Sequence, residues 1–122
     1  MQTNKDSKLR RQVTQFLSEF KTLVTHDPCN FKYNSKNEQT LIKLGYTFDQ
    51  CEEEFMGLQL ENYYSGPNDD YNGGVYWVFG KTVQGSMIYI KIKIHTKKDG
   101  TDIPYCLGFH FPDHPMNNFP LR

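Results

Sequence analysis

The chain has 122 residues, with 14 basic and 14 acidic side chains and 15% aromatic residues. This length predicts one domain over 1–122, large enough to bury a core without disulfide or metal staples. The aromatic content argues against disorder, the zero net charge against a global attraction to nucleic acid, and the absence of a long apolar run against a membrane span. The N-terminus lacks the apolar core of a signal peptide, and three widely spaced cysteines suit reduced thiols, so we expect a cytoplasmic protein.

The balanced charge conceals a segmental pattern. Residues 1–46 carry eight basic and four acidic side chains, residues 47–80 carry seven acidic and no basic ones, and residues 81–122 carry six basic and three acidic ones. An anion-binding surface is therefore expected from the two ends of the chain. The acidic middle is either an ordinary solvated face or a device that keeps a basic site from binding polyanions indiscriminately.

The N-terminal half carries helical signals. Apolar residues at spacings of three and four predict a helix over 6–24, and the composition of 26–36 predicts a loop. A shorter helix is expected over 37–44, ended by a glycine C-cap at Gly45. Thr47 and Gln50 fit a capping box that opens a third helix, which extends to about Met56 and ends at Gly57. Residues 58–64 suit one more short helical turn.

The pattern changes at Gly66. Residues 66–74 have the composition of a loop, and strands are expected over 75–83, 86–96 and 103–111. In the middle strand, isoleucines alternate with the polar-face residues Tyr89, Lys91, Lys93 and His95. Helices followed by an antiparallel meander indicate an α+β fold, with N-terminal helices packed on a C-terminal antiparallel sheet.

Turn residues predict how these strands pair. Gln84-Gly85 fits a two-residue turn, and Asp99-Gly100 is a strong type I′ signal. Counting outward from both turns gives these cross-strand pairs: Gly80–Tyr89, Val78–Lys91, Tyr89–His110, Lys91–Gly108 and Lys93–Cys106. The opposite face then collects only apolar side chains, which are Trp77, Phe79, Ile88, Ile90, Ile92, Leu107, Phe109 and Phe111. We expect that face to pack on the first helix.

The other face brings together Tyr89, Lys91, Lys93 and His110, with Gly80 and Gly108 leaving room beside them. A solvated sheet face is often merely polar. These side chains, however, suit the binding and cleavage of a phosphodiester.

Metal-independent RNA cleavage needs a base for the 2′-OH, cations for the charged phosphorane and an acid for the leaving 5′-oxygen. His110 can serve as acid or base, and Lys91 supplies a fixed charge, with Lys81 or Lys93 in support. Tyr89 can donate a hydrogen bond or stack on a nucleobase. Such a site needs no cofactor.

Other motifs carry weaker signals. His110 and His114 have a metal-like spacing, but Pro112 and Pro115 exclude a helix there, so a metal site is disfavoured. No complete phosphate-binding loop is present. Three glutamates after Cys51 disfavour a thiolate, and Cys106 is expected mainly to pack.

An ordered set of short motifs runs from about residue 10 to residue 116. Its members are Leu44 to Asp49, Gly57-Leu58, Tyr63-Tyr64, Trp77, Gly85 to Lys91 and Gly108 to His110. This set resembles the motility quorum-sensing regulator (MqsR) family of bacterial toxins. Three further motifs, Tyr63 to Pro67, Trp77 to Lys81 and Pro115-Met116, resemble a longer branch of that family.

The resemblance implies a RelE-like α+β fold. It implies an mRNA interferase, a metal-independent toxin that cuts mRNA and is held inactive by a cognate antitoxin. Of the family's catalytic positions, the tyrosine falls on Tyr89 and the last lysine on His110. The positions of the other lysine and the glutamine hold Ser65 and Val78, so Lys81 or Lys91 would have to supply the missing cation.

Three hypotheses follow from these observations. The first is an endoribonuclease toxin with catalytic residues His110, Tyr89, Lys91 and Lys81 and RNA-binding residues Lys93, Tyr64 and Ser65. The second is a catalytically degenerate RNA- or protein-binding module on the same scaffold, such as a mobile-element or defence factor, with the acidic segment 47–70 as a protein contact. A third, a metallohydrolase using His110 and His114, would lose activity with a chelator.

Overall fold

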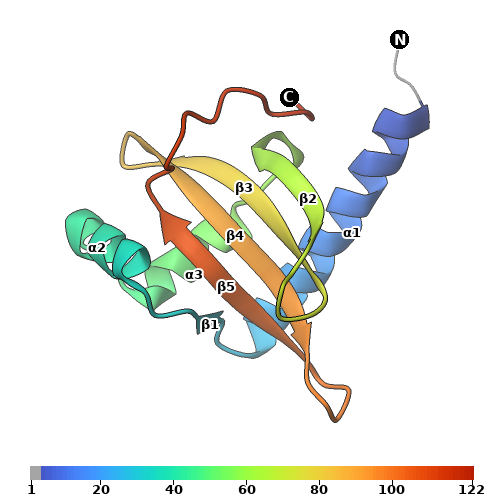
Figure 1. The fold of residues 1–122 in the computed structure, drawn as a ribbon, viewed down its shortest axis with the longest axis horizontal. Helices are drawn as coiled ribbons and strands as arrows, with labels where there is room; N and C mark the ends of the chain where they lie inside the picture. Colours follow the sequence, from blue (N-terminus) through green and yellow to red (C-terminus); the bar gives the residue numbers. More distant parts are fainter. Residues whose placement is uncertain (1–3) are drawn as a thin grey trace.

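Three α-helices and a five-stranded sheet build the protein in the computed structural model, which describes residues 4–122. The helices are α1 (Asn4–His26), α2 (Ser35–Leu44) and α3 (Phe48–Met56). The strands are β1 (Asn30–Phe31), β2 (Tyr63–Asp69), β3 (Val75–Val83), β4 (Ser86–Thr96) and β5 (Asp102–His110), in the spatial order β1-β5-β4-β3-β2 (Figure 1). The α+β prediction is confirmed, but the sheet is mixed rather than antiparallel, because β1 pairs with β5 in parallel.

Local sequence signals set the helix ends. Gly45 ends α2 in the left-handed conformation at φ 67°, and the predicted capping box between Thr47 and Gln50 opens α3. The α2 helix begins at Ser35, two residues before its predicted start, because the Asn34 side chain accepts a hydrogen bond from the Asn37 backbone. The expected helical turn after Gly57 is a 3-10 turn over Leu60–Asn62.

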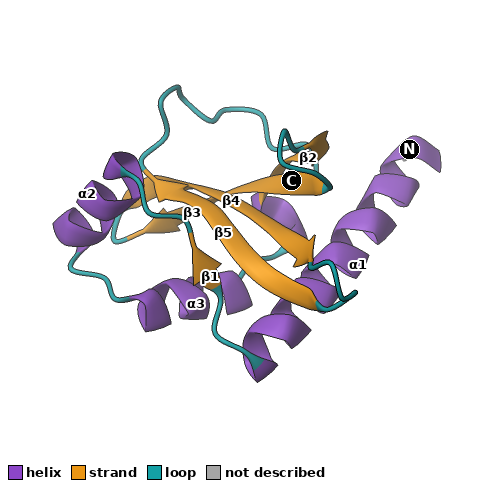
Figure 2. Ribbon diagram, turned by 60° about the horizontal axis from the view of Figure 1, so that its bottom comes forward, coloured by secondary structure: helices purple, strands orange, loops and turns teal. Residues whose placement is uncertain are grey.

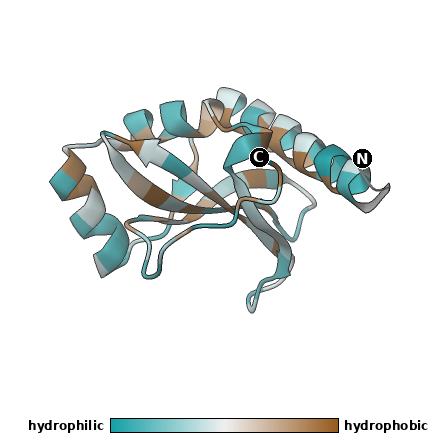
Figure 3. Cartoon of the chain, turned by 90° about the horizontal axis from the view of Figure 1, so that it is seen from above, coloured by the Kyte–Doolittle hydropathy of each residue, from teal (hydrophilic) through white to brown (hydrophobic). Residues whose placement is uncertain are grey.

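The core lies between one face of the sheet and the helices α1 and α3 (Figure 2). Phe16 of α1 stacks on Trp77 of β3 at 4.9 Å between ring centroids, and Phe20 meets Phe55 of α3 edge-on at 5.8 Å. Hydrophobic residues concentrate in the strands beneath the helices (Figure 3). The predicted packing of the apolar sheet face on the first helix is therefore confirmed.

The predicted pairing of β3 with β4 is confirmed. Gly80 pairs with Tyr89 and Val78 with Lys91, across a two-residue turn at Gln84-Gly85. Where β4 meets β5, the predicted type I′ turn is wrong. The Lys97 amide donates to the Thr101 carbonyl at 2.8 Å, which leaves a three-residue loop that ends at Gly100 with φ 88°.

The longer loop shifts the register by one residue, so Lys93 pairs with Tyr105 instead of Cys106. A β-bulge at Leu107 then restores the predicted pairs Tyr89–His110 and Lys91–Gly108. Because of the bulge, Leu107 leaves the core face on which it was predicted. The buried Cys106 takes a position in the core.

The Asn37 side chain holds this bulge in place. Its Nδ2 donates to the carbonyls of Lys32 at 3.0 Å and Leu107 at 3.2 Å, and its Oδ1 accepts from the Phe109 amide at 2.9 Å. Asn37 is buried, so α2 is fastened to the edge of β5 by a satisfied polar group.

Strand β2 was predicted as a helical turn and a loop. It pairs with β3 antiparallel through two register shifts and contains Gly66, Pro67 and Asn68, which are poor strand formers. Tyr63 provides the anchor, because its ring is buried beside Trp77 and Phe79. The strand therefore depends on pairing and burial rather than on its own propensity.

Residues 111–122, here called the C-terminal segment, cross the sheet face opposite α1 and α3 (Figure 2). Phe119 and Met116 lie so close over Gly80 that a Cβ added there would come within 2.8 Å of the Phe119 ring. The room predicted beside Gly80 is thus filled by the protein itself. No helix within the described residues combines the length and the apolar character that crossing a bilayer requires.

Candidate functional site

A cavity of about 480 Å³ opens on the polar face of the sheet. Its floor is formed by β4 and the end of β5, and its walls by the β1–α2 connection and the C-terminal segment. We call it the polar-face cavity; it is lined by Lys32, Asn34, Tyr64, Tyr89, Lys91, Leu107, Gly108, His110, Pro112, Asp113, His114, Pro115 and Met116. The predicted trio Tyr89, Lys91 and His110 is therefore brought together in one concave site.

His110 is held in a defined orientation. Its ring stacks on Tyr89 with centroids 5.0 Å apart and planes 22° apart, and its Nδ1 lies 2.8 Å from the Phe111 carbonyl oxygen. A carbonyl oxygen only accepts hydrogen bonds, so Nδ1 carries a proton. In the neutral imidazole, Nε2 then bears the free lone pair and can act as a base.

Tyr89 and Lys91 supply a neutral donor and a cation. Burial, with smaller contributions from Tyr76 and Asp113, raises the pKa of Tyr89, so its hydroxyl keeps its proton at neutral pH. The Lys91 Nζ lies 4.1 Å from the centroid of the Tyr76 ring and forms no ion pair with any described residue.

Gly108 makes this arrangement possible at the cavity floor. A Cβ at Gly108 would come within 3.3 Å of the Lys91 Cβ and within 3.5 Å of the His110 ring. A Cβ at this position would crowd the Lys91 side chain and would touch the His110 ring at an ordinary van der Waals distance.

The Asp113 carboxylate of the cavity is paired with a lysine that does not line the cavity. Asp113 forms an ion pair with Lys36 of α2 at 2.6 Å, and this hydrogen bond is the main reason that its pKa lies below the usual range. Electrostatic interactions with His110 and His114 also lower the pKa of Asp113. Lys32 and Lys91 therefore give the cavity a positive character that suits an anion.

Lys81 does not reach this site, contrary to the prediction. It pairs with Ile88, which directs it to the helix-covered face, and its Nζ lies 2.8 Å from a Glu54 carboxylate oxygen. Burial alone would raise the pKa of Glu54, but hydrogen bonds from Lys81 and Tyr46 hold it below its usual value. Lys81 therefore joins β3 to α3.

Lys93 is on the predicted face but is not free to bind RNA. It is 4% exposed, and its Nζ contacts Asp70 at 2.7 Å and the Gly73 carbonyl oxygen at 2.6 Å. These contacts fasten the β2–β3 loop onto β4. The same ion pair engages Asp70, which belongs to the acidic segment 47–70 that the second hypothesis treats as a protein contact.

Of the other two predicted RNA-binding residues, Tyr64 and Ser65, the structure places only Tyr64 in the polar-face cavity. Tyr64 lines the polar-face cavity and packs edge-on against Phe119 at 5.3 Å. Ser65 pairs with Val78 and accepts a hydrogen bond from Asn68 at 3.2 Å, outside the set that lines the cavity.

Sequence reasoning missed Lys32 and the cavity role of His114. Neither belongs to the strand pattern; the parallel pairing of β1 with β5 and the path of the C-terminal segment bring them in. Among the described residues, no group of three or more His, Cys, Asp and Glu side chains is arranged to hold a metal ion.

The cysteines lie apart from this chemistry. Cys29, Cys51 and Cys106 are buried free thiols, and burial is the main cause that raises the pKa of each of them. Their nucleophilic thiolate forms are therefore suppressed near neutral pH.

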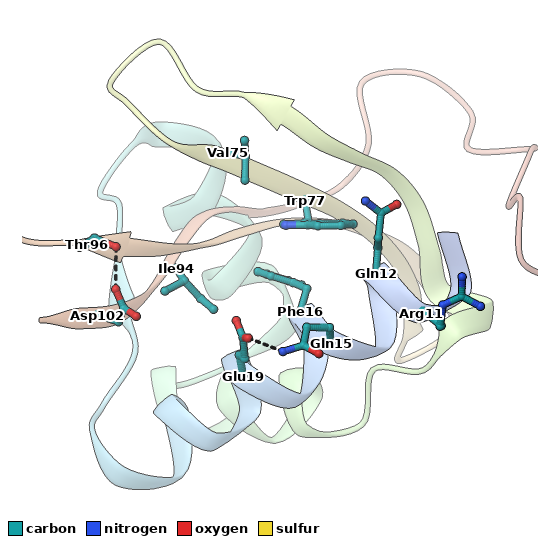
Figure 4. A pocket seen from close by; sticks show the side chains of 10 residues that line it. All are labelled: Arg11, Gln12, Gln15, Phe16, Glu19, Val75, Trp77, Ile94, Thr96 and Asp102. Atoms are coloured by element: carbon teal, nitrogen blue, oxygen red, sulfur yellow. Dashed lines mark hydrogen bonds between the residues drawn. The ribbon is translucent and has the colours of Figure 1, made fainter. Parts of the chain in front are cut away.

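A larger cavity, of about 580 Å³, lies between α1 and the far ends of β3, β4 and β5 (Figure 4). Phe16 and Trp77 form its apolar floor. The rim carboxylates are engaged, Glu19 by Gln15 at 2.7 Å and Asp102 by Thr96 at 2.6 Å. Its lining contains no histidine, lysine or cysteine, so it lacks the acid–base groups of the polar-face cavity.

Comparisons of this chain with protein-family models, characterised proteins and solved structures give no match. The side chains of the polar-face cavity are therefore the basis on which a function can be assigned.

Proposed function

We propose that the protein is a metal-independent endoribonuclease that cleaves RNA by attack of a 2′-OH on the adjacent phosphodiester. The observation that carries this proposal is the convergence of His110, Lys91 and Tyr89 in one positively charged cavity. A histidine with an available nitrogen, a cation and a neutral hydroxyl can supply the base and the charge stabilisation that this reaction needs.

Each group has a part in the reaction. The Nε2 of His110 accepts the proton of the 2′-OH, Lys91 stabilises the negative charge that develops on the phosphorane oxygens, and the Tyr89 hydroxyl donates a hydrogen bond to one of them. Lys32 at the cavity wall attracts the phosphate backbone, and the Tyr64 ring offers a surface for a nucleobase.

We include in this proposal the biological role that the resemblance to the MqsR family implies. The protein is an mRNA interferase toxin of the MqsR type, acting on cytoplasmic mRNA and restrained by a cognate antitoxin. The cation of the site is then Lys91 rather than Lys81, because Lys81 is paired with Glu54 on the other face.

The test is cleavage of defined RNA oligonucleotides in the presence of EDTA, with the product ends mapped. We expect 2′,3′-cyclic phosphate and 5′-hydroxyl ends, no cleavage of 2′-deoxy substrates, and losses of about 100-fold or more in His110→Ala and Lys91→Ala. His26→Ala, at the exposed end of α1, is the matched control and should retain activity. Inducible expression in cells should stop growth for the wild type but not for His110→Ala.

One observation favours the second hypothesis, a binding module without catalysis. Lys81 and Lys93, two of the three cations expected at the phosphate, are held by carboxylates. If a folded wild-type protein binds RNA in a manner that depends on Lys32 and Lys91 but never cleaves it, the binding module replaces the nuclease.

A further inference from the structure

We infer that His114 is the general acid of the polar-face cavity and works as the partner of the base His110. This inference rests on the proposed nuclease function and adds to it the group that protonates the leaving oxygen. His110 and His114 line one cavity, whereas the other two of the four histidines lie outside it.

The C-terminal segment holds His114 at the cavity wall. Upstream, the segment continues directly from β5 through Phe111, whose carbonyl oxygen is bound to His110. Downstream, Met116 and Phe119 pack over Gly80, and Leu121 joins the core. The exposed His114 is therefore presented from a segment that is fastened at both ends.

The surroundings of the two imidazoles suit opposite tasks. The Nδ1 of His110 is occupied by a carbonyl oxygen, which leaves one nitrogen for proton exchange. Neither ring nitrogen of His114 has a hydrogen-bond partner among the described residues, so both are available to a ligand.

The resulting step balances in protons and bonds. The 2′-OH gives its proton to His110 as the O2′–P bond forms, and the P–O5′ bond breaks as His114 gives its proton to the 5′-oxygen. The products are a 2′,3′-cyclic phosphate and a 5′-hydroxyl, and the two histidines end with their protonation states exchanged. Lys91 keeps its charge throughout.

A leaving-group substitution tests this assignment. An RNA oligonucleotide with a 5′-bridging sulfur at the scissile position releases a thiolate, which departs without a proton. The single-turnover cleavage rates of the normal and the sulfur-containing substrate are compared for the wild type, His110→Ala, His114→Ala and the control His26→Ala, with folding checked by circular dichroism.

We expect His114→Ala to lose about 100-fold on the normal RNA and to regain near-wild-type rates on the sulfur substrate. His110→Ala should be slow on both substrates. Wild-type rates on normal RNA in His114→Ala, or rescue by sulfur in His110→Ala instead, would overturn the assignment of His114 while leaving the nuclease intact. A wild-type protein that cleaves neither substrate would overturn the proposed function itself.

Discussion

Replacing Asn37 by alanine tests whether one buried amide fixes the β-bulge beneath the candidate site. The substitution removes both donor contacts to the Lys32 and Leu107 carbonyls and the acceptor for the Phe109 amide. An unpaired buried amide costs about 1–3 kcal/mol, and each of the other two bonds contributes about 0.5–1.5 kcal/mol. Alanine regains about 0.5 kcal/mol of helix propensity in α2. We therefore expect a loss of about 3 kcal/mol.

The assay is urea unfolding at pH 7, followed by circular dichroism, for the wild type and the variant. Gln39→Ala is the matched control, because Gln39 lies on the exposed side of the same helix and bonds only to Ser35. It should change the free energy of unfolding by less than about 0.5 kcal/mol. Asn37→Asp should be at least as unstable as Asn37→Ala, because a carboxylate oxygen would face two carbonyl oxygens. A loss below about 1 kcal/mol in Asn37→Ala would refute the claim that this side chain fastens α2 to β5.

Three further predictions concern other parts of the fold. Lys93→Met should cost about 3 kcal/mol at pH 7 by leaving the Asp70 carboxylate unpaired. Because Lys93 lowers the pKa of Asp70, its contribution is present above about pH 4 and is lost as the pH falls through the folded-state pKa, so urea unfolding at low pH should show a smaller difference. Gly80→Ala should displace Phe119 and speed hydrogen exchange in the C-terminal segment, and unchanged protection there would contradict the packing. Burial raises the pKa of Cys51 to about 12, so Ellman's reagent should label it slowly at pH 8 until urea unfolds the chain.

The sequence alone determined the features that depend on near neighbours. The capping box at Thr47, the glycine that ends α2 and the turn at Gln84-Gly85 use interactions within a few residues, so their signals are local. The alternation along β4 separated a core face from a polar face, because the pleat repeats every two residues. The predicted pair Tyr89–His110 is correct only because the β-bulge at Leu107 cancels the one-residue error of the predicted type I′ turn.

The tertiary structure alone decided which lysines are available to bind a ligand and which segment forms the wall of the polar-face cavity. Lys93 shares the polar-face alternation with Lys91 in the sequence, and Lys81 lies beside that face at Gly80, but the partners of these two lysines, Asp70 and Glu54, come from distant segments. The bulge at Leu107 is stabilised by a side chain 70 positions away in the chain, and β2 forms against β3 despite poor strand propensity. The C-terminal segment carries His114 to the cavity because Phe119 and Leu121 are buried against the fold. Such long-range burial and pairing leave no periodic trace in the sequence, because their energies depend on which surfaces meet after folding.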